Sequence, residues 1–296
     1  MQRIRRKLFQ ICEANHPVTV RQAFYQAVSL GLVAKSEAEY DNTVGRLLSE
    51  MRMWWFEHVE GPSADMSELE ALASKNGIPF EWIVDNTRWK QQPTTYLSTD
   101  EAMNALAKSF RRDLWDEAKA YVEIWVEKDA LAGVLYQVTE EYDVPLMPAH
   151  GYSSISFLKQ AAQSISRYWY DKPAYIYLFG DRDPSGLDAH RDIEDKLRMF
   201  APSVSWHFRR VAVTLRQIDE WNLQTRPTKK SDPRAKNFKG ESVELDAIPP
   251  QTLRDLVRKC VTKHVDEKRL EELRRTEEAE RAILQSGAQV LSRIHA

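Results

Sequence analysis

Three acidic residues fall directly after segments rich in β-forming side chains. Glu127 follows the run Tyr121–Val126, and Asp181 and Asp183 follow the run Ala174–Phe179. Alternate residues of an extended chain point to the same side, so Asp181 and Asp183 can address one point, and Glu127 can join them if the two strands are neighbours. Carboxylate oxygens alone suit a hard cation, Mg²⁺ or Mn²⁺. Such a metal neutralises charge that develops on a phosphodiester and orients the leaving oxygen.

A structural interpretation of the same residues stays open. An aspartate after a strand can simply cap the next helix, and a glutamate at a strand end can be an ordinary surface residue. Pro184 and Gly186 shape the turn after Asp183. Acidic residues at two strand ends, together with this turn, support the metal hypothesis more strongly than any one of these residues does alone.

A second pair that could do chemistry lies near the N-terminus. Arg21 and Tyr25 are four residues apart, so they share one face of the helix expected from Val20 to about Leu30. A guanidinium can hold a phosphate bidentately and stabilise a phenolate. A free phenol has a pKa of about 10 and needs a cation, a base or a metal-polarised phosphate to react at neutral pH. The alternative is that Tyr25 belongs to an apolar helix face and is part of the core.

The second half of the chain must position the acidic residues, and its pattern is alternating. β-forming runs alternate with segments that have helical spacing, which is typical of right-handed βαβ units and a parallel sheet covered on both faces. Ligands of such sheets gather beyond the carboxyl ends of the strands. A charged helical tail is expected from Leu253. The expected strands are Tyr121–Val126, Val144–Met147, Ala174–Phe179 and Val204–Val213, and the expected helices lie at about 129–142, 153–169 and 185–200.

The first half is predicted to be helical. Helices are expected at 3–14, at 20–30 with Thr19 as its cap, and from Ser36 through Met51. Three short helices with a turn near Gly31 resemble a helix-turn-helix arrangement. The run Ile78–Val84 is expected to form a β wing. A linker at 90–99 and a helix from Thr99 to about Ala118 then lead into the second half.

Composition limits the class of protein. The chain has 296 residues, of which 43% are hydrophobic and 29% charged, so a sizeable core and two domains are expected. No apolar run is long enough for a membrane span, and no secretory signal follows the basic N-terminus. The two cysteines form no metal or disulfide motif, which fits a reducing cytoplasm. These features predict a cytoplasmic protein with no membrane partner.

Charge is uneven along the chain. The formal net charge is −2, yet residues 1–35 and 226–240 are both rich in Lys and Arg. Two positive segments on an acidic body are typical of a groove for a polyanion. Solvated surface segments explain the same pattern equally simply.

Together these residues resemble a known family. The Glu127 strand end, the βαβ alternation and the string Asp183-Pro184-Ser185-Gly186 look like a Toprim domain, the metal-binding domain of type IA and type II topoisomerases, primases and some nucleases. The version in the topoisomerase VI A subunit and its meiotic double-strand-break relative is most similar. The segment Thr19–Tyr25 resembles the part of that family's winged helix that carries the DNA-cleaving tyrosine. The segment Val243–Ala247 resembles one that follows Toprim in these proteins.

The resemblance implies a fold, a mechanism and partners. It implies an α/β protein with a winged-helix domain over residues 1–98 and a Toprim domain with a helical C-terminal extension over residues 99–296. Tyr25, assisted by Arg21, would attack a DNA phosphodiester and form a 5′-phosphotyrosyl link. Glu127 would act as general acid/base and metal ligand, and Asp181 and Asp183 would ligate Mg²⁺. In this family the tyrosine of one chain meets the metal site of the other, so a nucleoid-associated homodimer on double-stranded DNA is expected.

The chain also departs from the family. It is short, and Tyr25 comes early, so the N-terminal extension that engages an ATPase partner subunit is expected to be missing. No phosphate-binding loop of an ATPase is present in the sequence. A small free-standing relative from bacteria, archaea or mobile elements fits these departures. The alternatives are a hydrolytic Toprim nuclease of a plasmid- or phage-defence type in which Tyr25 is structural, and a non-catalytic DNA-binding module.

Overall fold

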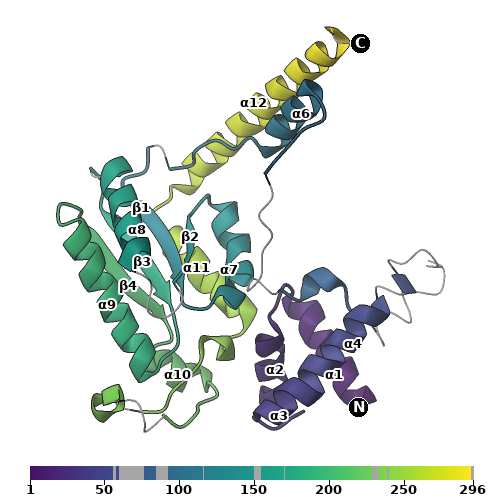
Figure 1. Ribbon diagram of the computed structural model, residues 1–296, viewed down its shortest axis with the longest axis vertical. Coiled ribbons are helices and arrows are strands. Elements are labelled where there is room, and N and C mark those ends of the chain that lie inside the picture. The colour runs from purple at the N-terminus through teal and green to yellow at the C-terminus, as the bar shows by residue number, and fades with distance from the viewer. Residues whose placement is uncertain are drawn as a thin grey trace.

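The structure is a computed structural model that describes residues 1–55, 58–59, 77–84, 93–115, 117–149, 155–169, 171–228, 233–238 and 240–294. Within these residues a helical N-terminal unit packs against a parallel sheet that carries helices on both faces (Figure 1). The fold is α/β, as the alternating pattern predicted. None of the described helices is both long enough and apolar enough to cross a lipid bilayer.

The sheet has four parallel strands in the order β2-β1-β3-β4. The central strands β1 and β3 are neighbours, and Val126 lies opposite Phe179 in their register. The two strands therefore end at the same level, and the residues that follow them leave the sheet side by side. The strands are β1 (Tyr121–Val126), β2 (Leu146–Pro148), β3 (Ala174–Phe179) and β4 (Trp206–Ala212).

Two pairs of helices cover the two faces of the sheet. Alternate side chains of β1 point to opposite faces. Ile124 packs in the apolar cluster of α7 and α11, whereas Trp125 packs in the cluster of α8 and α9, and both are fully buried. The covering helices are α7 (Asp129–Glu141), α8 (Ile155–Tyr168), α9 (Pro184–Phe200) and α11 (Pro250–Val261).

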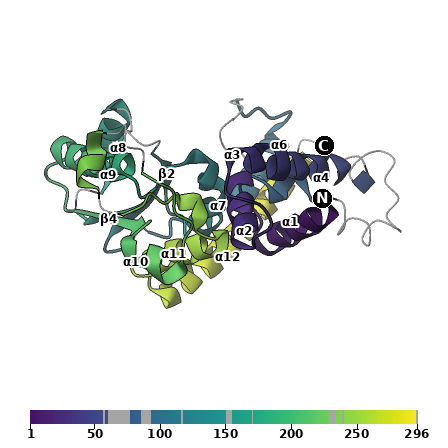
Figure 2. The same cartoon turned by 90° about the horizontal axis from the view of Figure 1, so that it is seen from below.

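The N-terminal unit lies on the side of α7 that faces away from α8 and α9 (Figure 2). Its apolar residues belong to the same cluster as α7 and α11, so one core joins the two halves of the chain. Thr19 caps α2 in a reciprocal capping box with Gln22, as its position predicted. Its elements are α1 (Gln2–Asn15), α2 (Val20–Ser29), α3 (Glu37–Glu39), the π-helical turn η1 (Tyr40–Gly45) and α4 (Arg46–Trp55).

The third helix differs from the prediction. A single helix was expected from Ser36 through Met51, but the structure has a wider π-helical turn over Tyr40–Gly45 between α3 and α4. The turn brings the Tyr40 carbonyl so close to Gly45 that a Cβ there would lie 3.1 Å from its oxygen. Glycine at position 45 therefore accommodates the wider turn.

The expected β wing at Ile78–Val84 is wrong. Phe80–Trp82 forms a 3₁₀ turn, η3, and only Ile83 makes an isolated β-bridge, with Val18. The indole of Trp82 stacks on His16 at 4.7 Å between ring centroids. Tertiary packing on α1 thus overrides the β propensity of the segment.

The helix from Thr99 is shorter than expected. It ends at Ser109 instead of near Ala118 and forms α6 (Thr99–Ser109). The chain beyond it is held extended by the C-terminal helix α12 (Glu267–Ile294), because Arg281 donates to the Phe110 carbonyl at 2.8 Å and Glu277 accepts from the Arg112 N–H at 2.9 Å. Helices α6 and α12 lie against each other and project from the sheet (Figure 1).

Three short elements lie between β4 and α11: α10 (Leu215–Trp221), η4 (Pro233–Asn237) and η5 (Leu245–Ala247).

We predict that Ile124→Ala lowers the free energy of unfolding by about 2–5 kcal/mol, because it leaves a cavity beneath α7 and α11. Urea denaturation followed by circular dichroism measures this change. Tyr136→Ala, at a position on α7 where the side chain is 52% exposed, is the control and should change stability by less than about 0.5 kcal/mol. Equal losses in the two variants would contradict the assigned core.

Candidate functional site

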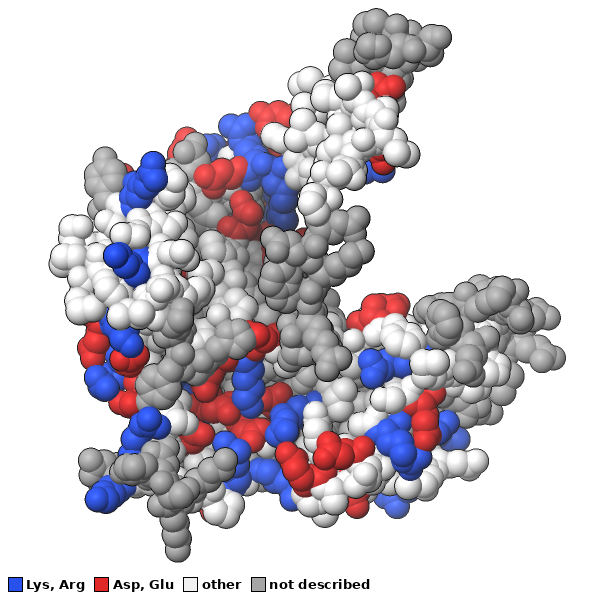
Figure 3. Space-filling view, viewed as in Figure 1, with Lys and Arg blue, Asp and Glu red and all other residues white. Residues whose placement is uncertain are grey.

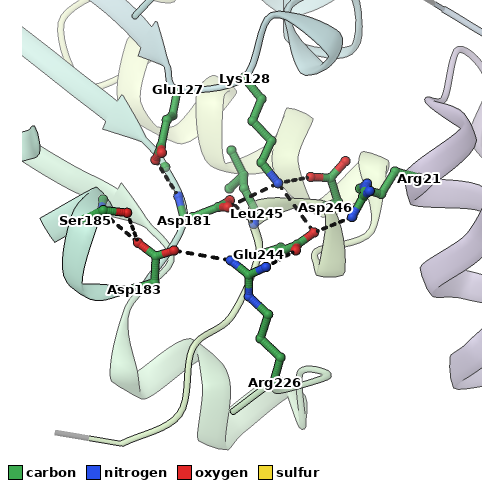
Figure 4. A network of polar contacts seen from close by, with 12 residues as sticks. Arg21, Glu127, Lys128, Asp181, Asp183, Ser185, Arg226, Glu244, Leu245 and Asp246 are labelled. Carbon is green, nitrogen blue, oxygen red and sulfur yellow. Dashed lines mark hydrogen bonds and ion pairs between the residues drawn. The ribbon is translucent and has the colours of Figure 1, made fainter. Parts of the chain in front are cut away.

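Three of the five predicted site residues, Arg21, Glu127 and Asp181, line one open cavity of about 930 Å³ at the carboxyl ends of β1 and β3. Its walls come from both halves of the chain: Arg21 and Tyr40 from the N-terminal unit, and Glu127, Asp181 and other polar residues from the sheet. Acidic and basic side chains intermingle on this face of the molecule (Figure 3). Figure 4 shows that they form one connected network.

Glu127 faces the backbone that leaves the neighbouring strand. Its Oε2 accepts the N–H of Asp181 at 2.8 Å. A Cβ on Gly180 would lie 2.6 Å from that oxygen, so the close approach requires glycine. Burial, with a further contribution from the charge of Asp181, raises the pKa of Glu127 to about 7. At neutral pH this carboxyl is therefore present in both protonation states.

Asp181 is a buried carboxylate with two different partners. Its Oδ1 accepts the N–H of Leu245 at 2.8 Å, and its Oδ2 lies 3.2 Å from the ammonium of Lys128. Burial raises the pKa of Asp181, and the Lys128 charge opposes that shift. Asp181 therefore ties the end of β3 both to the residue after Glu127 and to the segment that precedes α11.

Asp183 takes the capping role that the sequence left open. Its Oδ1 accepts the N–H of Gly186 at 2.7 Å and the hydroxyl of Ser185 at 2.9 Å, which caps α9. Its Oδ2 lies 3.2 Å from the Arg226 guanidinium. The two aspartates thus differ, because Asp181 takes no part in the cap and faces Lys128 instead.

Lys128 lies among three carboxylates. Its Nζ is 2.6 Å from Asp246, 3.2 Å from Asp181 and 3.6 Å from Glu244. Burial of Lys128 opposes its charge, but these three anions outweigh burial and raise its pKa. The side chain is a permanent ammonium at the centre of an acidic cluster.

Glu244 connects the two halves of the chain. Its carboxylate lies 2.7 Å from Arg226 and 3.2 Å from Arg21, in addition to its contact with Lys128. Burial opposes ionisation, but these cations hold the pKa of Glu244 below its ordinary value. Glu244 is ionised and shared by three cationic side chains.

Tyr25 joins the same network from α2. Its phenol lies beside the carboxylate of Glu244, and its ring packs edge-on against Phe24 and lies beneath the ammonium of Lys35. The side chain is only 3% exposed. Burial and the Glu244 charge raise the pKa of Tyr25 further above its ordinary value. In this conformation Tyr25 is protonated and covered, and it belongs to the core and to the polar network at once.

Arg210, on β4, fixes the turn after β3. Its guanidinium donates to the carbonyl of Gly180 at 2.8 Å, to that of Gly186 at 3.3 Å and to that of Asp181. Burial lowers the pKa of Arg210, and Glu127 opposes that shift. A charged group with several carbonyl acceptors holds the backbone that carries Asp181 and Asp183.

The carboxylate oxygens at the strand ends are ligands that a hard metal ion prefers, but the two aspartates form ion pairs with cationic side chains in this structure. All three predicted ligands, Glu127, Asp181 and Asp183, offer carboxylate oxygen. A Cβ on Gly186 would lie 2.5 Å from the backbone carbonyl oxygen of Asp181 and 3.3 Å from oxygens of Glu127 and Asp183, so the tight turn between these carboxylates requires glycine. In the part of the chain that the structure describes, no three acidic, histidine or cysteine side chains are arranged as a metal site. Lys128 and Arg226 neutralise the two aspartates instead.

The structure thus brings together all five residues predicted from the sequence: Arg21, Tyr25, Glu127, Asp181 and Asp183. Sequence reasoning missed four charged residues that connect them: Lys128, Arg210, Glu244 and Asp246. Glu244 and Asp246 lie within the segment that resembled the family, and Lys128 directly follows Glu127, so position alone could have pointed to them. Arg210 gave no signal, because it lies within a strand-like run. Of the second basic segment, Lys229, Lys230 and Lys239 lie outside the described residues.

Comparison with known proteins adds no family to this picture. The sequence matches no protein-family model, and no curated protein is found to be similar to it. The chemistry of the site therefore has to be inferred from its own geometry.

We predict that Glu127→Gln changes stability in a pH-dependent way in EDTA. Because the folded-state pKa of about 7 exceeds the ordinary 4.5, the stability that protonated Glu127 contributes is fully present below pH 4.5 and is lost as the pH rises through 7. Glutamine stays neutral and can still accept the Asp181 N–H. The variant should match wild type at pH 4 and exceed its free energy of unfolding by about 1–3 kcal/mol at pH 8. Urea denaturation at both pH values tests this, and a variant less stable than wild type at pH 8 would show that Glu127 is not desolvated.

Proposed function

We propose that the chain is a DNA-cleaving transesterase of the topoisomerase VI A-subunit type, built from a winged-helix-like N-terminal unit and a Toprim-like sheet. The observation that supports this most strongly is the single polar network that joins Arg21 and Tyr25 of α2 to the acidic strand ends. The two groups are separated by about a hundred residues of sequence. Arg21, Glu127 and Asp181 line one open cavity, which suits a substrate that both groups must touch.

The proposed reaction exchanges one phosphodiester for another. The phenolic oxygen of Tyr25 attacks phosphorus and loses its proton, a 5′-phosphotyrosyl bond forms, and the 3′-oxygen leaves and takes up a proton. Glu127 has a pKa of about 7, so it can give a proton to the leaving 3′-oxygen and take it back on religation, while the proton that Tyr25 loses passes to solvent. Arg21 lies on the same helix face and can hold the phosphate. Because the covalent link conserves the bond energy, resealing needs no ATP.

Mg²⁺ or Mn²⁺ is part of this proposal. The residues that would hold it are Glu127, Asp181 and Asp183, and the metal would supply charge neutralisation at the phosphodiester. In the described conformation Asp181 and Asp183 are paired with Lys128 and Arg226, so metal binding competes with these ion pairs. A homodimer on double-stranded DNA completes the proposal. Because Arg21 and Tyr25 lie beside the acidic strand ends of their own chain, each chain would cut one strand with its own residues, which differs from the arrangement in the family, where the tyrosine of one chain meets the metal site of the other.

Burial of Tyr25 favours a second candidate, a hydrolytic nuclease. A tyrosine that is only 3% exposed cannot reach a phosphate without moving. In the hydrolytic case water is the nucleophile and Tyr25 only fastens α2 to the sheet. The two candidates differ in one product, since only the transesterase leaves protein attached to DNA.

We predict that wild-type protein forms a covalent adduct with labelled supercoiled or hairpin DNA in Mg²⁺ or Mn²⁺, and that Tyr25→Phe loses it. Trapping with SDS and electrophoresis detects label that migrates with protein. Tyr142→Phe, which removes a hydroxyl from a buried tyrosine away from the cavity, is the control and should retain the adduct. Cut DNA without an adduct would establish the hydrolytic candidate. If the protein binds DNA in EDTA but does not cut it under any condition, the result would favour the non-catalytic DNA-binding module.

We also predict that Asp181→Asn reduces metal-dependent cleavage at least 100-fold, because several kcal/mol of charge stabilisation are lost. The fold should persist, since asparagine can still accept the Leu245 N–H. Initial cleavage rates at saturating Mg²⁺ measure the effect, with circular dichroism as the folding check. Asp192→Asn removes an aspartate paired with Lys196 on the surface of α9 and should leave the rate unchanged. Wild-type cleavage by Asp181→Asn would remove Asp181 from the mechanism.

A further inference from the structure

Three cationic side chains converge on one carboxylate at the mouth of the cavity. Arg226 lies 2.7 Å, Arg21 3.2 Å and Lys128 3.6 Å from oxygens of Glu244. The cations come from three separate parts of the chain: helix α2, the turn after β1 and the segment after α10. Their side chains remain 26–33% exposed, whereas Glu244 is 7% exposed.

This arrangement provides more donors than a carboxylate needs. Two guanidinium groups and an ammonium surround two oxygen atoms, and such donor sets match the non-bridging oxygens of a phosphodiester. The carboxylate of Glu244 thus occupies the position that an anionic ligand would take. All three cations also line the open cavity, so a ligand can reach them from solvent.

We propose that Arg21, Lys128 and Arg226 form a subsite for a DNA backbone phosphate, that Glu244 fills this subsite when DNA is absent, and that DNA displaces Glu244 and thereby frees Tyr25. The identity of the anion as DNA rests on the proposed function. The subsite itself rests on the contacts of the three cations.

The charge balance favours exchange over simple addition. The three cations face five carboxylates, of Glu37, Glu244, Asp246, Asp181 and Asp183. A phosphate added to this cluster would increase an excess of negative charge, which a partly buried site does not tolerate. Replacement of Glu244 by a phosphate leaves the balance unchanged.

Rotation of one side chain is sufficient for the exchange. The backbone on both sides of Glu244 is anchored, because Val243 pairs with Arg182 and the Leu245 N–H donates to Asp181. Only the Glu244 side chain has to leave the cations. Since the charge of Glu244 acts on the nearby Tyr25 phenol, departure of this carboxylate changes the surroundings of the proposed nucleophile.

Binding of a short fluorescent DNA duplex in EDTA tests the subsite without cleavage. We expect Glu244→Gln to bind the duplex about 5–10-fold more tightly than wild type at low salt, because the competing anion is gone. Glu37→Gln is the matched control. It removes the same charge from Arg21 at a position that is 72% exposed, and it should change affinity less than twofold. Equal affinities of Glu244→Gln and Glu37→Gln would overturn the proposal.

Loss of the cations gives an independent measurement if Glu244→Gln does not fold. Arg226→Gln should weaken duplex binding about fivefold, whereas Arg216→Gln, at an exposed ion pair on α10, should not. Inorganic phosphate that binds at these residues while the duplex does not would replace DNA by free phosphate as the ligand and overturn this assignment. Because no step requires cleavage, a failed trapping assay leaves these outcomes unaffected.

The release of Tyr25 has its own spectroscopic readout. In protein labelled with 3-fluorotyrosine, the ¹⁹F signal of Tyr25 is assigned from its loss in Tyr25→Phe. Addition of the duplex to wild type should shift that signal toward its position in Glu244→Gln. A Tyr25 signal that does not respond to a bound duplex would show that DNA does not displace Glu244.

Discussion

Neutralisation of buried carboxylates by Lys128 and two arginines is the interaction on which the site depends. Parallel pairing of β1 with β3 places Glu127 and Asp181 at one level, and burial of several like charges at such a point is unfavourable unless cations accompany them. Lys128, which directly follows Glu127, supplies one such charge at the centre. Glu127 makes no ion pair among the described contacts, and burial together with the charge of Asp181 raises its pKa.

The same ion pairs join the two halves of the chain. Glu244 lies in the segment between β4 and α11, yet it pairs with Arg21 of α2. A second polar link lies nearby, where Arg254 of α11 donates to the carbonyls of Asn15 and Pro17. Beneath both lies a continuous apolar core that contains Tyr25. The shared apolar core holds the two halves of the chain together, while the ion pairs position the charged residues that line the cavity.

Much of this arrangement was accessible from the sequence because it depends on local patterns. The strand runs before Glu127 and Asp181 are dense in β-forming residues, and Thr19 with Gln22 is a complete capping box, so sheet, helix and strand-end positions followed. The wing at Ile78–Val84 failed because stacking of Trp82 on His16 is a contact between distant segments. Arg210 and Glu244 were missed for the same reason, since their importance lies in partners far along the chain. Asp183 shows the remaining difficulty: one side chain can cap a helix through one oxygen and face the site through the other.

The environment of Tyr25 connects these observations to reactivity. Burial and an adjacent anion both raise the pKa of a phenol, so the described conformation disfavours the phenolate that would attack phosphorus. A phosphate that replaces the Glu244 carboxylate would still be an anion, and would by itself leave the pKa of Tyr25 high. Under the proposed function, activation would require Arg21 and Lys128, whose charges oppose the raised pKa of this phenol, to act on it while the phosphate presents its electrophilic phosphorus. A chain without substrate would keep its nucleophile protonated and covered, and reactivity would arise only when the backbone phosphate, the cations and Tyr25 meet in the same cavity.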